Sequence, residues 1–251
     1  MKIQPVLLIT IIFFSSLSAR ARDFLIAGQQ SPPFFSENKK QFEGGMFDAM
    51  KEVCAEMKFN CKFELIVPAR AFKMLEEGTV DAVVNIVPTE ERSVYTHFAP
   101  PIISSNMVYM AHPDKKVPKM ASIKDLAGWN VAAVRKTNSL LNAQKHQSEV
   151  KSMVISEVTD NETLVEKLLN DQYGPKTLII GPEDVLNYIA EKKKIKLDSI
   201  LVADELPLTV GFSKKKVPAA EAGALDQAIS KLKANGTIKK VLDRYQLRAA
   251  K

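Results

Sequence analysis

The segment formed by residues 80–92 constrains the fold more than any other part of the chain. It begins with a short apolar run rich in β-branched residues, 80–84, between Gly78 and Pro88, which predicts a buried strand. Thr89 is a typical helix N-cap, and the two glutamates after it suit the first turn of a helix. Arg92 would then lie near the carboxyl end of the strand, where open α/β sheets bind their ligands.

Arg92 is the strongest candidate for a ligand-binding residue. Its guanidinium group is planar and permanently charged, which suits a carboxylate. We therefore predict that Arg92 binds the carboxylate of a ligand and that backbone groups from Asn85 to Val87 lie beside it. The alternative is a surface charge that pairs with Glu90 or Glu91.

The first 21 residues have the pattern of a secretory signal peptide. Lys2 gives a positive start, residues 6–17 are apolar, and Ala-Arg-Ala at 19–21 fits the cleavage site. The apolar run is shorter than the roughly 20 residues that a membrane span requires. We expect a mature protein that begins near Arg22, carries no lipid anchor and is soluble outside the cytoplasm.

Charge and cysteine content narrow the classes of function. Loss of the signal peptide lowers the formal net charge from +6 to +4, and the lysine runs at 192–194 and 214–216 lack interleaved aromatics, so no nucleic-acid site is expected.

Cys54 and Cys61 are the only cysteines, and in an oxidising compartment we expect them to form a disulfide. Two ligands without a nearby histidine are too few for a metal site. No metal or other cofactor is therefore predicted.

Several motifs resemble the bacterial periplasmic solute-binding proteins of the polar amino-acid type, family 3. They are the Thr-x-x-Arg pattern at 89–92 followed by His-Phe-Ala-Pro-Pro at 97–101, the Leu-Ala-Gly-Trp-Asn-Val-Ala-Ala-Val segment at 126–134, and the helix, glycine and second helix of 225–245. Together they span nearly the whole mature chain. The spacing of the two cysteines also agrees with some amino-acid binders of this family.

The resemblance implies a two-lobed α/β fold of the type II periplasmic-binding class. Each lobe would be a mostly parallel sheet flanked by helices, and two crossing strands, at 107–111 and 206–212, would join the lobes. The boundaries we expect are 1–21 for the signal peptide, 22–110 with 207–251 for the first lobe, and 111–206 for the second. Ligand capture would follow hinge closure of the lobes.

The first lobe departs from the family where an aromatic ring stacks on the ligand. Ser31 and Pro68 occupy the two aromatic positions. Phe34 or Phe35 could replace the first ring, although a core role is equally open. Arg70 could meet a ligand anion near the second position, or it could simply be solvated.

The second lobe is expected to supply an anion-binding helix N-terminus and an acidic side chain that holds the ligand's ammonium group. The family has glycine where this chain has Lys136, between Arg135 and Thr137 at a predicted helix N-terminus. Thr137 is the predicted donor, with Arg135 as an additional cation. For the acid that holds a ligand ammonium in amino-acid binders, Glu183 is the nearest match. Asp184 is second and Pro182 fits if the register shifts by one, and the alternative for both acids is helix capping.

The function predicted from these features is a periplasmic receptor, not an enzyme. It would capture a small carboxylate, such as an acidic amino acid, for an inner-membrane ABC-type transporter, and we expect a monomer. One alternative is a cyclohexadienyl dehydratase-like enzyme in which Glu183 donates a proton. Another is a sensor, which would have to signal through a membrane partner because the chain ends at Lys251 without a second membrane segment.

Overall fold

The computed structural model describes residues 21–250, so the predicted signal peptide lies outside the described residues except for Ala21. The strands are β1 (Asp23–Gly28), β2 (Ser36–Asn38), β3 (Gln41–Glu43), β4 (Asn60–Leu65), β5 (Ala82–Ile86), β6 (Thr96–Phe98), β7 (Ile103–Ala111), β8 (Asn130–Val134), β9 (Val154–Val158), β10 (Thr177–Pro182) and β11 (Asp198–Ser213). The helices are α1 (Gly45–Met57), α2 (Pro68–Glu77), α3 (Glu90–Ser93), α4 (Asn138–Glu149), α5 (Asn161–Leu169), α6 (Glu183–Lys192), α7 (Ala219–Ala234) and α8 (Thr237–Asp243), with 3-10 turns η1 (Pro113–Lys115) and η2 (Ile123–Leu126).

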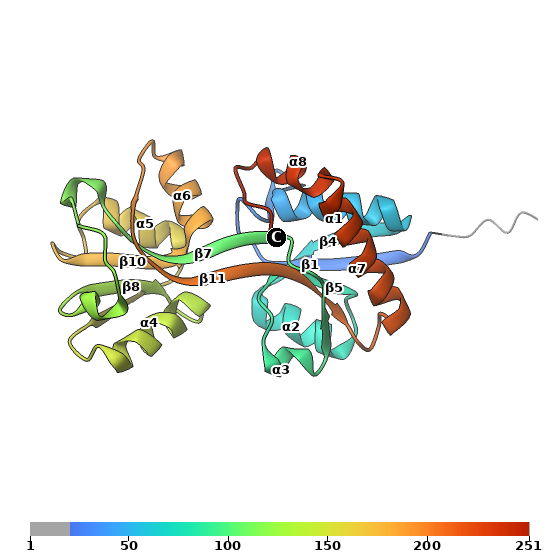
Figure 1. Cartoon of the computed structure of the whole chain (residues 1–251), viewed down its shortest axis with the longest axis horizontal. Coiled ribbons are helices and arrows are strands. Elements are labelled where there is room, and N and C mark those ends of the chain that lie inside the picture. The colour runs from blue at the N-terminus through green and yellow to red at the C-terminus, as the bar shows by residue number, and fades with distance from the viewer. Residues whose placement is uncertain (1–20, 251) are drawn as a thin grey trace, which may run out of the picture.

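Two α/β lobes are joined by a pair of long strands. Figure 1 shows β7 and β11 running side by side from one lobe to the other. The first lobe contains β1 to β6, α1 to α3, α7 and α8, and the second contains β8 to β10 and α4 to α6. The predicted two-lobed α/β fold class is therefore confirmed.

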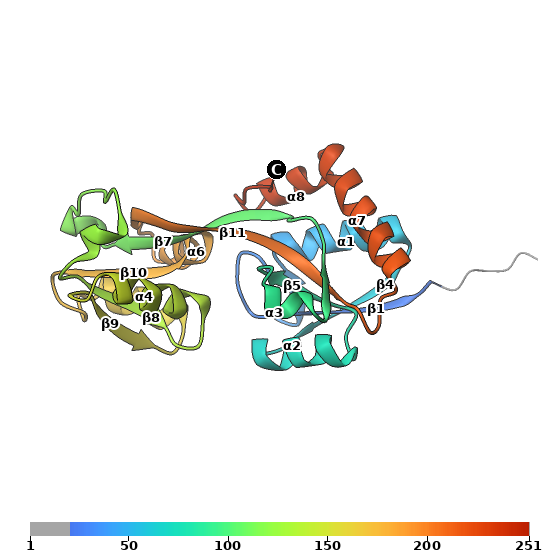
Figure 2. The same cartoon turned by 60° about the horizontal axis from the view of Figure 1, so that its bottom comes forward.

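The strand order is β4-β1-β5-β11-β7-β10-β8-β9, with β6 also paired to β11. Pairing is parallel within the β4-β1-β5 group and within the β10-β8-β9 group. The strands β7 and β11 are antiparallel to each other and to their outer neighbours, β10 and β5. In each lobe, helices cover both faces of the sheet (Figures 1 and 2).

The central strands are apolar because helices bury them on both faces. In β5, four of the five residues are buried, which agrees with the apolar run seen in the sequence. The helix α1 buries Met46, Met50 and Val53 at helical spacing against the first-lobe sheet. These methionines and their neighbours therefore serve the core, as their periodicity predicted.

The crossing strands are longer than the sequence indicated. Expected at 107–111 and 206–212, they run over Ile103–Ala111 and Asp198–Ser213. They extend because β11 pairs with β7 along much of its length and continues into the first lobe, where it pairs with β5 and β6. The lobe boundaries near 110 and 207 stay a prediction, since both strands pass from lobe to lobe without interruption.

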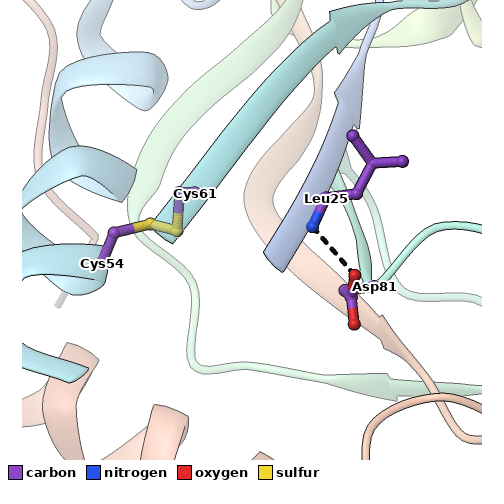
Figure 3. Close-up of a disulfide and its surroundings, with 4 residues drawn as sticks. All are labelled: Leu25, Cys54, Cys61 and Asp81. Carbon is purple, nitrogen blue, oxygen red and sulfur yellow. Dashed lines mark hydrogen bonds between the residues drawn. A yellow bond between two sulfur atoms is a disulfide. The ribbon is translucent and has the colours of Figure 1, made fainter. Parts of the chain in front are cut away.

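A disulfide and a buried acid fix the first-lobe sheet (Figure 3). Cys54 in α1 is bonded to Cys61 in β4, so the predicted bridge is present and ties a helix to the edge strand. On the other side of β1, the carboxylate of Asp81 accepts a hydrogen bond from the Leu25 amide at 2.8 Å. The disulfide thus fastens α1 to the edge of the sheet, and the Asp81 contact joins the start of β5 to β1.

Across residues 21–250, no helix combines the length and hydrophobicity needed to cross a bilayer.

Candidate functional site: a cleft between the lobes

The cleft between the two lobes has a volume of about 270 Å³. The first lobe contributes Gln29, Gln30, Ser31, Phe34, Ile66, Pro68, Ala71, Phe72, Val83, Val84, Asn85, Ile86, Val87 and Arg92. The crossing strands contribute Met107, Leu206 and Leu208, and the second lobe contributes Lys136, Thr137, Asn138, Ser139, Asn161 and Pro182. The strand ends and helix starts of both lobes thus meet at one place.

Arg92 lines this cleft and is held in place by its own lobe. Its backbone amide donates to the Thr89 hydroxyl at 3.3 Å, the N-cap interaction that the sequence predicted. One guanidinium nitrogen donates to the Val87 carbonyl at 3.1 Å, and the guanidinium carbon lies 4.1 Å from the centre of the Phe72 ring. Within residues 21–250, no acidic side chain forms an ion pair with Arg92. The group is therefore oriented but not neutralised, which suits an anionic ligand.

Asn85 places an unpaired amide at the same wall of the cleft. It adopts the left-handed conformation (φ 58°), which asparagine tolerates better than most residues. Its side-chain oxygen and nitrogen are both buried and have no hydrogen-bond partner among the described residues. Since an unpaired buried amide costs about 1–3 kcal/mol, a polar ligand group at this position would be stabilising.

Phe34 lines the cleft from the loop after β1. It is buried, and its carbonyl accepts hydrogen bonds from the first residues of α1, including Met46 at 2.8 Å. The residue before α1, Gly44, allows the Phe34 carbonyl to come this close to the helix. It has φ 123°, and a Cβ atom there would lie 2.4 Å from the Phe34 oxygen. Phe35, the alternative ring, packs in the core against Phe42 and Phe63.

In the second lobe, Thr137 caps α4 at the cleft. Its hydroxyl accepts from the Leu140 amide at 3.5 Å and donates to the Val134 carbonyl at 2.6 Å. With its proton thus committed, the contribution of this segment to a ligand would come from the first amides of α4, which lack partners within the helix. Lys136 next to it has φ 59°, the left-handed region that favours glycine and explains the glycine of the family pattern.

Two predicted cations do not line the cleft. Arg70 is exposed on α2 and lies beside a shallow surface hollow, whereas the next residue, Ala71, faces the cleft. Arg135 is also exposed and does not line the cleft, whereas the neighbouring residue Lys136, which is exposed as well, is part of the lining. Arg70 and Ala71 are successive residues of α2 and point about 100° apart, so only one of them faces the cleft. Arg135 and Lys136 lie in the turn between β8 and α4.

The acids after β10 are not among the residues that line the cleft. Glu183 accepts a hydrogen bond from the Asn106 amide at 2.7 Å and lies 3.6 Å from the Arg248 guanidinium. Asp184 accepts from the Ser105 hydroxyl, and its pKa is raised by burial, an effect that this hydrogen bond opposes. Both acids therefore pack at the start of α6 against β7.

Pro182 is the residue of this turn that lines the cleft. Which of Pro182, Glu183 and Asp184 corresponds to the ligand-holding position stays a prediction, although only Pro182 lines the cleft here. As a result, the described residues that line the cleft include no aspartate and no glutamate. The roles of Glu183, Arg70 and Arg135 in binding stay predictions without a contact in this structure.

Sequence reasoning did not select Phe72, Ser139 or Asn161. Phe72 occurs one turn after Pro68, so helical spacing from a cleft position was the available signal. Asn161 follows the N-cap Asp160 at the start of α5, a position that a search for helix N-termini beside strand ends would find.

Over the described part of the chain, no group of three or more His, Cys, Asp or Glu side chains is arranged to hold a metal ion.

Two α/β lobes joined by two strands around a cleft are the architecture of a periplasmic-type binding protein. The chain belongs to the bacterial extracellular solute-binding proteins, family 3, whose family model matches residues 25–248. It is 25% identical over 222 residues to the probable amino-acid-binding protein YxeM of Bacillus subtilis (strain 168). The aligned region covers 87% of this chain and 81% of that protein.

Solved structures share the fold at lower identity. A histidine kinase sensor domain with similarity to periplasmic binding proteins superposes with a TM-score of 0.75 at 16% identity, over 92% of this chain and 99% of that one. The substrate-binding protein of an amino acid ABC transporter superposes with a TM-score of 0.69 at 19% identity, over 89% and 98%. At these identities the likeness establishes the fold alone.

Proposed function

We propose that the protein is a solute-binding receptor that captures a small carboxylate between its lobes. The observation that carries this proposal is Arg92, an oriented cation in the inter-lobe cleft without an acidic partner among the described residues. A ligand carboxylate would accept hydrogen bonds from its guanidinium group, and the Asn85 amide would gain a partner.

Closure of the lobes would complete the site. The first lobe provides Arg92 and Asn85, and the second provides the amides at the start of α4 near Thr137. A ligand that contacts both lobes stabilises the closed arrangement by its differential affinity for it. Delivery of the ligand to a membrane transporter is proposed from the family and from the likeness to an amino acid ABC transporter's binding protein.

The arrangement of acids supports a receptor over a dehydratase. Proton donation to a bound substrate requires a carboxyl group within hydrogen-bond reach of it. Glu183 is instead bonded to Asn106 beside α6, and the described lining residues include no acid. We therefore propose a binding function without a catalytic step.

The test is calorimetric titration of ligand-stripped, refolded protein with a panel of small mono- and dicarboxylates and amino acids. Arg92→Met removes the charge-assisted hydrogen bonds, each contributing about 1.5–3 kcal/mol, so affinity for the bound carboxylate should fall about 100-fold or more. Lys151→Met is the control, because it removes an exposed cation of the second lobe that does not line the cleft and has no predicted role in binding. Equal losses in the two variants, or no binding by any carboxylate, would contradict the proposal.

A further inference from the structure

One ion pair joins the two lobes. Arg248 follows α8 in the first lobe, and its guanidinium group lies 3.6 Å from the carboxylate of Glu183, the first residue of α6 in the second lobe. The other ion pairs of residues 21–250 each lie within one lobe. The contact between Arg248 and Glu183 therefore depends on how the lobes are arranged, whereas the others do not.

The segment that carries Arg248, residues 247–250, is fixed to the first lobe. Leu247 is buried in its core. The Arg248 carbonyl accepts a hydrogen bond from the Ser104 amide of β7 at 2.9 Å, and the Ala250 amide donates to the carbonyl of the residue just before β7 at 3.0 Å. The backbone of Arg248 is thus held where β7 leaves the first lobe.

The acids at the start of α6 are held on the other side of this contact. Glu183 accepts a hydrogen bond from the Asn106 side-chain amide at 2.7 Å. Burial raises the pKa of Asp184, and both the hydrogen bond from Ser105 and the nearby charge of Arg248 oppose this effect. Arg248 therefore interacts with two acids of the second lobe.

These contacts lie on the side of β7 that faces away from the cleft. Met107 of β7 pairs with Pro182 of β10, and both line the cleft. Successive residues of a strand point to opposite faces, so Asn106 points to the other face, where it binds Glu183. Figure 2 agrees: the segment after α8 lies above β7, whereas α2 and α4, whose first residues line the cleft, lie below it.

The position of this ion pair determines what closure does to it. A rotation about the crossing strands β7 and β11 that narrows the cleft moves the lobes apart on the opposite side of these strands. Arg248 and Glu183 would then separate, and their attraction would weaken with distance. The pair therefore stabilises the arrangement described here relative to a more closed one.

We infer that Arg248 and Glu183 form an inter-lobe latch that opposes closure and so lowers the affinity of the receptor for its ligand. This inference rests on the proposed receptor function and specifies how its binding site is regulated. If only a small fraction of the protein is closed without ligand, the apparent affinity is proportional to that fraction. Loss of the latch increases the closed fraction and should tighten binding, although neither residue lines the cleft.

The size of the effect follows from the exposure of the pair. The side chains of Arg248 and Glu183 are 55% and 26% exposed, so solvent weakens their attraction. For such a pair, removal of either partner should tighten binding about two- to fivefold. The direction is opposite to that expected for Arg92→Met.

The test is isothermal titration calorimetry of ligand-stripped wild-type protein and variants. The probe is the amino acid or carboxylate of the panel described above that the wild-type protein binds most tightly. Arg248→Gln and Glu183→Gln should each bind it about two- to fivefold more tightly, and Glu183→Gln keeps an acceptor for Asn106. Arg248→Lys retains the charge and should stay closer to the wild-type affinity than Arg248→Gln. The double variant should bind no more tightly than the better single variant, because both substitutions remove the same interaction.

Lys239→Gln is the matched control. It removes a cation from an exposed ion pair with Asp243 that lies within α8, in the first lobe alone. This variant should keep the wild-type affinity, since its contact does not change when the lobes move.

The outcomes separate the latch from the receptor function on which it rests. If the wild-type protein binds the probe and Arg248→Gln binds it no more tightly than Lys239→Gln does, the latch is wrong and the receptor function stands. A tenfold or greater loss of affinity in Glu183→Gln would mean that Glu183 contacts the bound molecule, which also contradicts the latch. If no compound of the panel binds the wild-type protein, the receptor function fails and the inference fails with it.

Discussion

The buried carboxylate of Asp81 should contribute strongly to the stability of the first lobe. Its side chain is 1% exposed and lies 2.7 Å from the Arg22 guanidinium and 3.0 Å from the Lys216 ammonium. It also accepts a hydrogen bond from the Leu25 amide at 2.8 Å. Three donors from three separate segments therefore converge on one acid beside the sheet.

The expected cost of replacing it can be estimated from these contacts. In Asp81→Asn one acceptor remains for Leu25, but both cation contacts weaken by about 1 kcal/mol each, the difference between charged and neutral hydrogen bonds. The side chains of Arg22 and Lys216 are 29% and 34% exposed, so water recovers part of this loss. We expect a decrease of about 1.5 kcal/mol in the free energy of unfolding. Asp81→Ala also leaves the Leu25 amide unpaired and should cost about 3–4 kcal/mol.

Urea denaturation followed by circular dichroism at 222 nm measures both changes, provided that the slope m is unchanged. Asp243→Asn is the control, because it breaks an exposed ion pair with Lys239 whose side chains are 68% and 54% exposed. That variant should lose less than 0.5 kcal/mol. If Asp81→Asn loses no more than Asp243→Asn, the argument from burial is wrong.

Two further measurements test the fold. Replacing both Cys54 and Cys61 by serine opens a short loop with a sequence separation of 7, and the loop-entropy relation gives a loss of about 2.5 kcal/mol, seen as a decrease of about 5–10 °C in the melting temperature. An unchanged melting temperature would argue against a closed bridge. In the second lobe, burial lowers the pKa of His146, which lies 2.7 Å from the Tyr109 hydroxyl. The unfolded chain therefore binds the proton first, so the free energy of unfolding should decrease as pH falls below about 6.5. His146→Gln keeps an acceptor for Tyr109 and should flatten this pH dependence.

Local structure could be predicted from the sequence because it depends on neighbouring residues. The apolar run of β5, the N-cap Thr89, and the pairing of Cys54 with Cys61 all appear where the patterns placed them. Arg92 likewise lies at the end of its strand because a strand, a short link and a capped turn leave little freedom for its position. These features follow from hydrophobic periodicity and capping chemistry.

Which of two adjacent residues faces the cleft was decided only by tertiary packing. Ala71 rather than Arg70, Lys136 rather than Arg135, and Pro182 rather than Glu183 line it. For α2 the sequence contains the period of the helix but not its rotation about its axis, which is set by packing against the sheet. The other two pairs lie in the turn after β8 and at the junction of β10 with α6, where the backbone conformation of the turn decides which side chain faces the cleft. Because a shift of one residue exchanges a charge for a neutral side chain at two of these three places, Arg70 with Ala71 and Glu183 with Pro182, the residues that line the cleft became known only from the folded arrangement of both lobes.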